Sequence, residues 1–100
     1  MADPVGSLSI ERWSGGGEHV LVLRGVVDDA GADDVSSAVE ELCAAHARII
    51  ELDLAQLACL DHRGIGAVIA AKEVCERHRI EFRLVPPQSG ARAPRAQLRL

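Results

Sequence analysis

The sequence predicts a small α/β domain in which a mixed four-stranded sheet carries two main helices on one face. The chain has 100 residues, of which 48% are hydrophobic and 26% charged, which is typical of one globular domain with a single core. Apolar residues alternate in three segments, form a nearly continuous run in a fourth and follow helical spacing in two others. These segments occur in the order strand, strand, helix, strand, helix, strand.

The first two strands are predicted to form a hairpin. Residues 8–13 alternate weakly and run into the turn cluster at residues 14–17, after which residues 19–24 are almost wholly apolar. A strand with apolar residues on both faces belongs in the interior of a sheet, so we expect the second strand to be central. The glycines of the turn lack the lysine and the following helix of a phosphate loop.

Helical spacing begins at Ala32 and predicts the first helix. Asp33 and Asp34 would lie in its first turn and His46 and Arg48 at its end, an arrangement that complements the helix dipole. The apolar positions of this helix are Val35, Ala38, Val39 and Leu42.

A third strand follows over residues 48–54, and the second helix is predicted over residues 61–79 with Asp61 as its N-cap. Gly64 and Gly66 fall in its first turns. Each glycine costs up to about 1 kcal/mol relative to alanine, which indicates that another backbone approaches closely there. The residues expected to face the core are Ile65, Val68, Ile69, Lys72 and Cys75.

The fourth strand is predicted over residues 80–85 and is ended by two prolines. Residues 87–100 are rich in alanine and arginine and include Pro94, so we expect a loosely ordered tail after a core of about residues 7–86 in a single domain, 1–100. Right-handed crossovers place both helices on one face and leave the other face open. The inward residues of the last strand are expected to be Ile80, Phe82 and Leu84.

Charge and aromatic content limit the classes of partner. Acidic residues dominate residues 1–62 and basic residues dominate 63–100, so the chain has an acidic half that suits a protein partner rather than nucleic acid. The two aromatic residues, Trp13 and Phe82, do not provide the stacking platforms of single-strand binders. No apolar run is long enough to insert into a membrane and no signal peptide is recognised, so we expect a cytoplasmic protein.

Three segments together resemble the STAS family, named for sulphate transporters and anti-sigma factor antagonists. They are residues 20–28, which end in Gly-x-x-Asp, residues 49–54, which end in Leu-Asp-Leu, and residues 59–68, which contain Asp-His-Arg-Gly-Ile-Gly. The resemblance implies that a stand-alone domain of this size is an anti-sigma factor antagonist. Such a protein binds an anti-sigma kinase and frees a sigma factor, and phosphorylation of a serine switches that binding off.

The resemblance also implies the site. His62 stands where the family has its phospho-acceptor serine, and Arg63 stands at the next hydroxyl position, so serine phosphorylation is expected to be lost. Neutral or positive groups at a helix N-terminus do not imitate a phosphate either. The usual C-terminal amphipathic helix is not supported by the residues around Pro94. The expected partner-binding residues are Gly25, Asp28, Asp61, His62, Arg63, Gly64 and Ile65.

We therefore expect a non-catalytic, bacterial protein-interaction domain that acts in partner-switching control of transcription, with an anti-sigma factor of the kinase type as its partner and no cofactor. A homodimer through the open sheet face is a further expectation. The alternative hypothesis is that the chain is a cytosolic STAS subunit that regulates a membrane transporter, or a small-ligand sensor.

Other residues suggest chemistry that we weigh against simpler roles. The pairs Cys43-x2-His46 and Cys75-x2-His78 have zinc-ligand composition, but both cysteines fall in apolar helical stripes, so we expect core thiols and no metal. A redox switch would need two of the three cysteines within disulfide reach. His62 beside Asp61 resembles an acid–base pair or a phosphohistidine site, but an exposed helix tip is a poor active site. Trp13 is expected to anchor the hairpin unless it is exposed on the open face.

Overall fold

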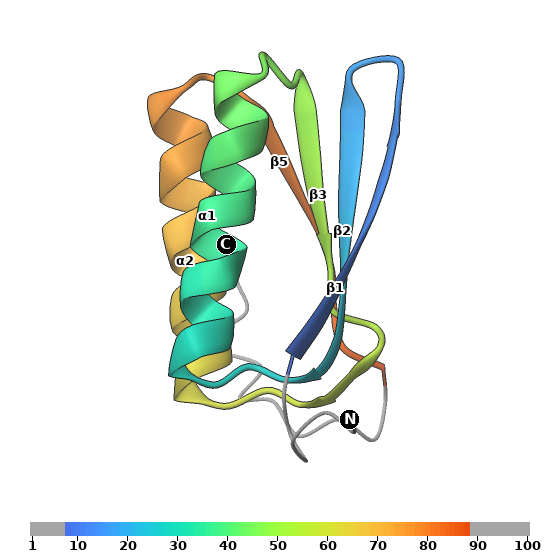
Figure 1. The fold of residues 1–100 in the computed structure, drawn as a ribbon, viewed down its shortest axis with the longest axis vertical. Coiled ribbons are helices and arrows are strands. Elements are labelled where there is room, and N and C mark those ends of the chain that lie inside the picture. Colours follow the sequence, from blue (N-terminus) through green and yellow to red (C-terminus); the bar gives the residue numbers. More distant parts are fainter. Residues whose placement is uncertain (1–7, 89–100) are drawn as a thin grey trace.

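The structure, a computed structural model, describes residues 8–88 and consists of a five-stranded sheet with both helices on one face (Figure 1). The predicted α/β class and the placement of the helices are confirmed. The expected loose tail lies, from residue 89 onward, outside the described residues. The elements are β1 (Leu8–Gly15), β2 (Glu18–Val26), α1 (Asp29–Ala44), β3 (Ile49–Asp53), β4 (Leu57–Cys59), α2 (His62–Arg77) and β5 (Glu81–Val85).

β2 is the central strand, as predicted. The order is β1-β2-β3-β5, in which β1 is antiparallel to β2 and the other neighbours are parallel. β2 is longer than β3 and pairs with it through residues 18–22, while Gly25 and Val26 pair with the short strand β4. The sequence predicted four strands and missed β4, because three residues are too few to show an alternating pattern.

The start of α1 differs from the prediction. The helix begins at Asp29, three residues before the expected Ala32, because the Asp28 carboxylate caps it and accepts a hydrogen bond from the Gly31 amide. Asp29, rather than Asp33 and Asp34, therefore lies in the first turn. Residues 29–34 contain no large apolar side chain, so hydrophobic spacing could not detect this turn.

One core lies between the helices and the face of the sheet that they cover. Two expectations for α2 were wrong: Ile69 is 42% exposed, and Lys72 pairs with Glu76 at 3.3 Å instead of facing the core. In residues 8–88 no helix has the length and apolar character needed to cross a membrane. The largest fully buried side chains are Leu21, Leu23, Val27, Val35, Val39, Ile50, Leu52, Leu54, Val68 and Cys75.

Cys43 of α1 and Cys75 of α2 are both buried in this core. Burial raises the pKa of both thiols, that of Cys75 to about 12. Cys59 of β4 is half-buried, and all three are free cysteines. The two core thiols are therefore held in the neutral form that an apolar interior favours.

We expect the free energy of unfolding to fall as the pH rises from 9 toward 12. The folded pKa of Cys75, about 12, lies above the ordinary value of 9.0, so the stability contributed by the neutral thiol is complete below pH 9 and is lost above it. Denaturant unfolding followed by circular dichroism at several pH values measures this slope. Cys75→Ala should flatten it and the control Cys59→Ala should not; equal slopes in all three proteins would contradict the coupling.

Candidate functional site

The N-terminal ends of the two helices lie side by side at one end of the molecule, at the bottom of Figure 1. α1 follows β2 and α2 follows β4, and these strands are parallel neighbours. The carboxyl ends of parallel strands meet at one edge of a sheet, so the loops that leave them are brought together. This arrangement places Asp28 next in space to the loop of Asp61, although the two residues are far apart in the sequence.

Both aspartates cap helices. The Asp28 Oδ1 atom accepts a hydrogen bond from the Gly31 amide at 2.7 Å. The Asp61 Oδ1 atom accepts one from the Arg63 amide at 3.0 Å and a longer one from the Gly64 amide at 3.3 Å. An N-cap of this kind contributes about 1 kcal/mol. Asp28 and Asp61 therefore fix the positions of the two helix tips whatever else they bind.

Arg63 joins the two tips. Its Nε donates to Asp29 Oδ1 of α1 at 2.8 Å, and its Nη1 lies 3.7 Å from Asp61 Oδ2. The Arg63 side chain is 56% exposed, so these ion pairs are screened by water and contribute at most about 1 kcal/mol. The guanidinium therefore shapes the surface more than it stabilises the fold.

A groove of about 400 Å³ runs between α1 and α2 beside Arg63. Its acidic and hydroxyl groups come from Asp29, Asp33 and Ser36, which the sequence analysis did not assign to the site. Gly66 and Ala70 are four residues apart and so lie on the same face of α2. Their small size was the sequence feature that could have predicted a groove on this face. The remaining lining residues are Ala32, Arg63 and Ala67.

We use the name helix-tip surface for Asp28, Asp29, Asp61, His62 and Arg63 together with this groove. All five residues are exposed except Asp61, which is partly buried. His62 is the first residue of α2 and does not line the groove. The structure therefore brings together the four polar residues that the sequence selected and adds Asp29 to them.

The three apolar or glycine residues of the predicted site lie beneath this surface. Gly25 has φ 95°, a conformation that side chains rarely adopt, at the register shift where β2 turns from β3 to β4. Gly64 is buried, and a Cβ there would collide with the Leu60 side chain. Ile65 is 5% exposed and belongs to the core, as its helical spacing predicted, so its side chain is not available as the partner contact that the resemblance implied.

Gly66 differs from Gly64. A Cβ added at Gly66 would meet nothing within 4 Å, and the residue is exposed on the groove. The close approach of another backbone, predicted from these two glycines, is found at neither: the neighbours of Gly64 are the side chains of Leu60 and Val27, and Gly66 has none within 4 Å. The structure alone gives Gly66 no packing reason to be glycine.

The opposite end of the helices holds the residues considered for zinc. His46 follows the C-cap of α1 and has φ 63°, whereas His78 is itself the C-cap of α2 and the residue after it, Arg79, has φ 58°. The histidine of the first Cys-x2-His pair therefore lies one residue beyond its helix C-cap, whereas the histidine of the second pair is the C-cap itself. Cys43, His46 and His78 line a cavity of about 520 Å³, but Cys75 does not. In residues 8–88, no three His, Cys, Asp or Glu side chains are grouped to hold a metal ion.

Comparison with solved structures places this fold among known ones. An anti-sigma factor antagonist from Mycobacterium paratuberculosis superposes with a TM-score of 0.73 at 20% identity, over 91% of this chain and 75% of that one. The antisigma-factor antagonist STAS domain from Rhodobacter sphaeroides gives 0.52 at 18% identity, over 86% and 95%. A chain described as Mglu gives 0.70 at 22% identity over 79% of this chain, which spans only 20% of Mglu. At these identities the likeness shows a shared fold.

The sequence itself carries the family assignment. No curated protein sequence matches the chain significantly. The family profile described as "Mlab, STAS domain" matches residues 12–100, which is most of the chain. The resemblance found in three short segments is confirmed over nearly the whole length, and the chain belongs to the STAS domain family.

Proposed function

We propose that this chain is a non-catalytic protein-interaction domain that acts as an anti-sigma factor antagonist in bacterial partner switching in the cytoplasm. The observation that carries the proposal is the helix-tip surface, where Arg63 bridges Asp29 of α1 and Asp61 of α2. It stands at the motif to which the STAS resemblance assigns partner binding. The folds shared with two antagonists support this reading.

Charge indicates the kind of partner surface. Within residues 8–88, four aspartates, Asp28, Asp29, Asp33 and Asp61, lie at the helix tips with one arginine, Arg63, so this part of the surface is acidic. A complementary partner presents basic residues, which raises the association rate and fixes the orientation of the complex. The proposed partner is an anti-sigma factor of the kinase type that carries such a basic surface.

The shape of the groove favours binding over catalysis. Gly66, Ala67 and Ala70 line it on the α2 side, and its polar groups come from two aspartates, one serine and Arg63. His62 lies outside it, so the groove does not combine the candidate base with the serine. A shallow groove with small residues accommodates a side chain from a partner protein.

The proposed binding is not controlled at residues 62 and 63 by a serine kinase. The Asp61 side chain already accepts the amide hydrogens that a phosphate at a helix N-terminus would use. His62 offers no hydroxyl group, and Arg63 is engaged with Asp29. We propose that the antagonist binds its partner constitutively.

We expect Arg63→Ala to weaken partner capture without unfolding the protein. Tagged wild-type protein is used to capture partners from bacterial lysate, and mass spectrometry should identify a kinase-type anti-sigma factor. Arg12→Ala is a matched control, because Arg12 is 51% exposed and forms a single ion pair with Glu41 at 3.1 Å. Both substitutions should change the free energy of unfolding by less than about 1 kcal/mol, and only Arg63→Ala should lose the partner.

The identity of the captured protein decides between the two functions. Recovery of a transporter ATPase or permease in place of an anti-sigma factor would contradict the proposal and support the transporter subunit. Equal recovery of the anti-sigma factor by both arginine variants would place its contact away from the helix-tip surface.

Gly66→Ala tests whether a partner enters the groove. A methyl group at this exposed helical position meets no atom, so we expect the free energy of unfolding to rise by about 0.5–1 kcal/mol. The same methyl group narrows the groove and should weaken partner capture. Thermal unfolding and quantitative capture measure the two effects. A variant that is more stable and binds equally well would show that the groove is not part of the contact.

Phosphorylation provides a separate test of the lost switch. Incubated with a cognate kinase and ATP, the wild-type protein should acquire no phosphate at residues 61–63, whereas His62→Ser restores a hydroxyl group at the helix tip. The helix N-terminus stabilises an added anion by about 0.3–1 kcal/mol. His62→Ser should be compared with and without Arg63→Ser, because Arg63 would pair with the phosphate. Detection of acid-labile phosphate on wild-type His62 by mass spectrometry would contradict this prediction. It would show that the protein is controlled by phosphorylation of a histidine instead of a serine.

A further inference from the structure

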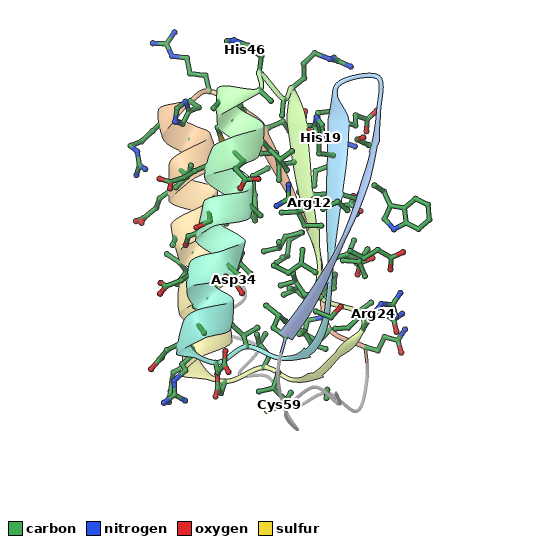
Figure 2. All side chains as sticks on the ribbon, in the orientation of Figure 1. Arg12, His19, Arg24, Asp34, His46 and Cys59 are labelled. Atoms are coloured by element: carbon green, nitrogen blue, oxygen red, sulfur yellow. The ribbon has the colours of Figure 1, made fainter. Side chains whose placement is uncertain are left out.

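The sheet face that points away from the helices carries one exposed tryptophan beside two valines, of which Val20 is half-buried and Val22 is 9% exposed. Trp13 of β1 is 59% exposed and lies directly opposite Val20 of β2. Val22 lies on the same side as Val20, because side chains alternate along a strand. The helices cover only the other face, and Arg24 in Figure 2 projects on the side away from them. Trp13 is thus not the hairpin anchor expected from the sequence but the centre of an open surface.

Acidic side chains surround these three apolar residues. The strand register places Glu11 of β1 opposite Val22 of β2. It also places Glu51 and Asp53 of β3 beside Val20 and Val22 of β2. Glu18 and Glu81 lie on the same face, on either side of Ile49. We call these five acidic residues together with Trp13, Val20 and Val22 the acidic sheet face.

The two arginines of this face are already paired. Arg24 contacts Glu11 at 3.0 Å. Arg83 contacts Glu81 at 2.6 Å and Glu18 at 3.6 Å, and its hydrogen bond to Glu81, followed by the charges of Glu81, Glu18 and Glu51, raises its pKa. Five carboxylates therefore face two guanidinium groups, and the face has a net negative charge at neutral pH.

We propose that the acidic sheet face binds a polypeptide segment in which lysine or arginine residues alternate with apolar residues. The apolar residues would cover Trp13 and the accessible part of Val20, and the basic residues would meet Glu51 and Asp53. Tryptophan is among the residues that dominate binding energy at interfaces. The flanking charges give the segment its orientation.

The same charges argue against other occupants. A second copy of the chain would bring two negative faces together, so we do not propose the homodimer that the open face first suggested. Nucleic acids and anionic lipid headgroups are repelled for the same reason. A segment with both basic and apolar residues can cover the exposed Trp13 indole and pair with the carboxylates.

This surface is separate from the helix-tip surface. The acidic sheet face lies on strands β1, β2, β3 and β5, whereas the helix-tip surface is built on the first turns of α1 and α2 (Figure 1). The proposal does not depend on the anti-sigma partner, and one chain could contact two proteins at once.

Trp13 makes the proposal directly measurable, because it is the only tryptophan and the chain has no tyrosine. The probes are a synthetic peptide of alternating leucine and lysine and a matched peptide of alternating leucine and glutamate. The lysine peptide should shift the Trp13 emission to shorter wavelength with saturation, and its affinity should fall as salt is added. The glutamate peptide should produce no shift.

Variants locate the binding. Calorimetry should show that Trp13→Ala weakens the lysine peptide by about thirtyfold, the effect of a hot-spot aromatic residue. Glu51→Lys should weaken it by about fivefold. Asp33→Lys makes the same charge change in the helix-tip groove and should leave the affinity unchanged. Circular dichroism checks the fold of each variant. If Glu51→Lys is unfolded, the comparison of Trp13→Ala with Asp33→Lys tests the proposal by itself.

Three results would overturn the proposal. The first is equal binding of the glutamate peptide, and the second is equal loss of affinity in Asp33→Lys and Trp13→Ala. The third is a concentration-dependent dimer in sedimentation that disappears in Trp13→Ala, which would make a second copy the occupant. None of these results changes the Arg63-dependent capture of a partner, so the two proposals fail separately.

Discussion

The hydrogen-bonded pairing of β2 with three other strands is the interaction on which the rest of the structure depends. β2 pairs with β1 on one edge, and on the other edge with β3 and then β4. Its inward side chains, Leu21 and Leu23, are 0% and 1% exposed. A shift of one residue in its register would turn these leucines to the open face and Val20 and Val22 to the core. The position of every other strand is set relative to this one.

The extra length of β2 is what creates the helix-tip surface. β3 stops at Asp53, whose carboxylate accepts a hydrogen bond from the Ala55 amide at 2.9 Å and so closes a turn. The chain then returns to β2 as β4 and delivers Asp61 beside the end of the same strand that delivers Asp28. Without β4, the loop before α2 would have no backbone partner to hold it there. The acidic residues of the site thus depend on a short strand that contributes few core contacts of its own.

Most of the fold was predictable because its signals are periodic. Alternation located β3 and β5, a nearly continuous apolar run located β2, and helical spacing located most of both helices. The capping role of Asp61 followed from residue type and position. β4 and the first turn of α1 were not predictable in this way, since β4 is too short to alternate and residues 29–34 have no large apolar side chain.

The candidate site was predictable in part. The resemblance to STAS sequences selected residues around both helix tips, but it did not separate the exposed Arg63 from the buried Ile65. It could not supply Asp29, because the ion pair with Arg63 depends on how α1 and α2 pack. The exposure of Trp13 likewise depends on which face of β1 meets the helices, and weak alternation in a hairpin strand does not settle that.

The two helices also end in the same unusual way, at His46 and Arg79, which hold left-handed backbone conformations without being glycine. A residue other than glycine in that conformation costs about 1–2 kcal/mol. Glycine is the residue most often found at this position after a helix, so either residue could be replaced by glycine with a gain in stability. Both lie at the end of the helices away from the helix-tip surface. This end of the domain is where mutations that compensate for a destabilised binding surface can accumulate, and where an engineered, more heat-resistant version of the chain would begin.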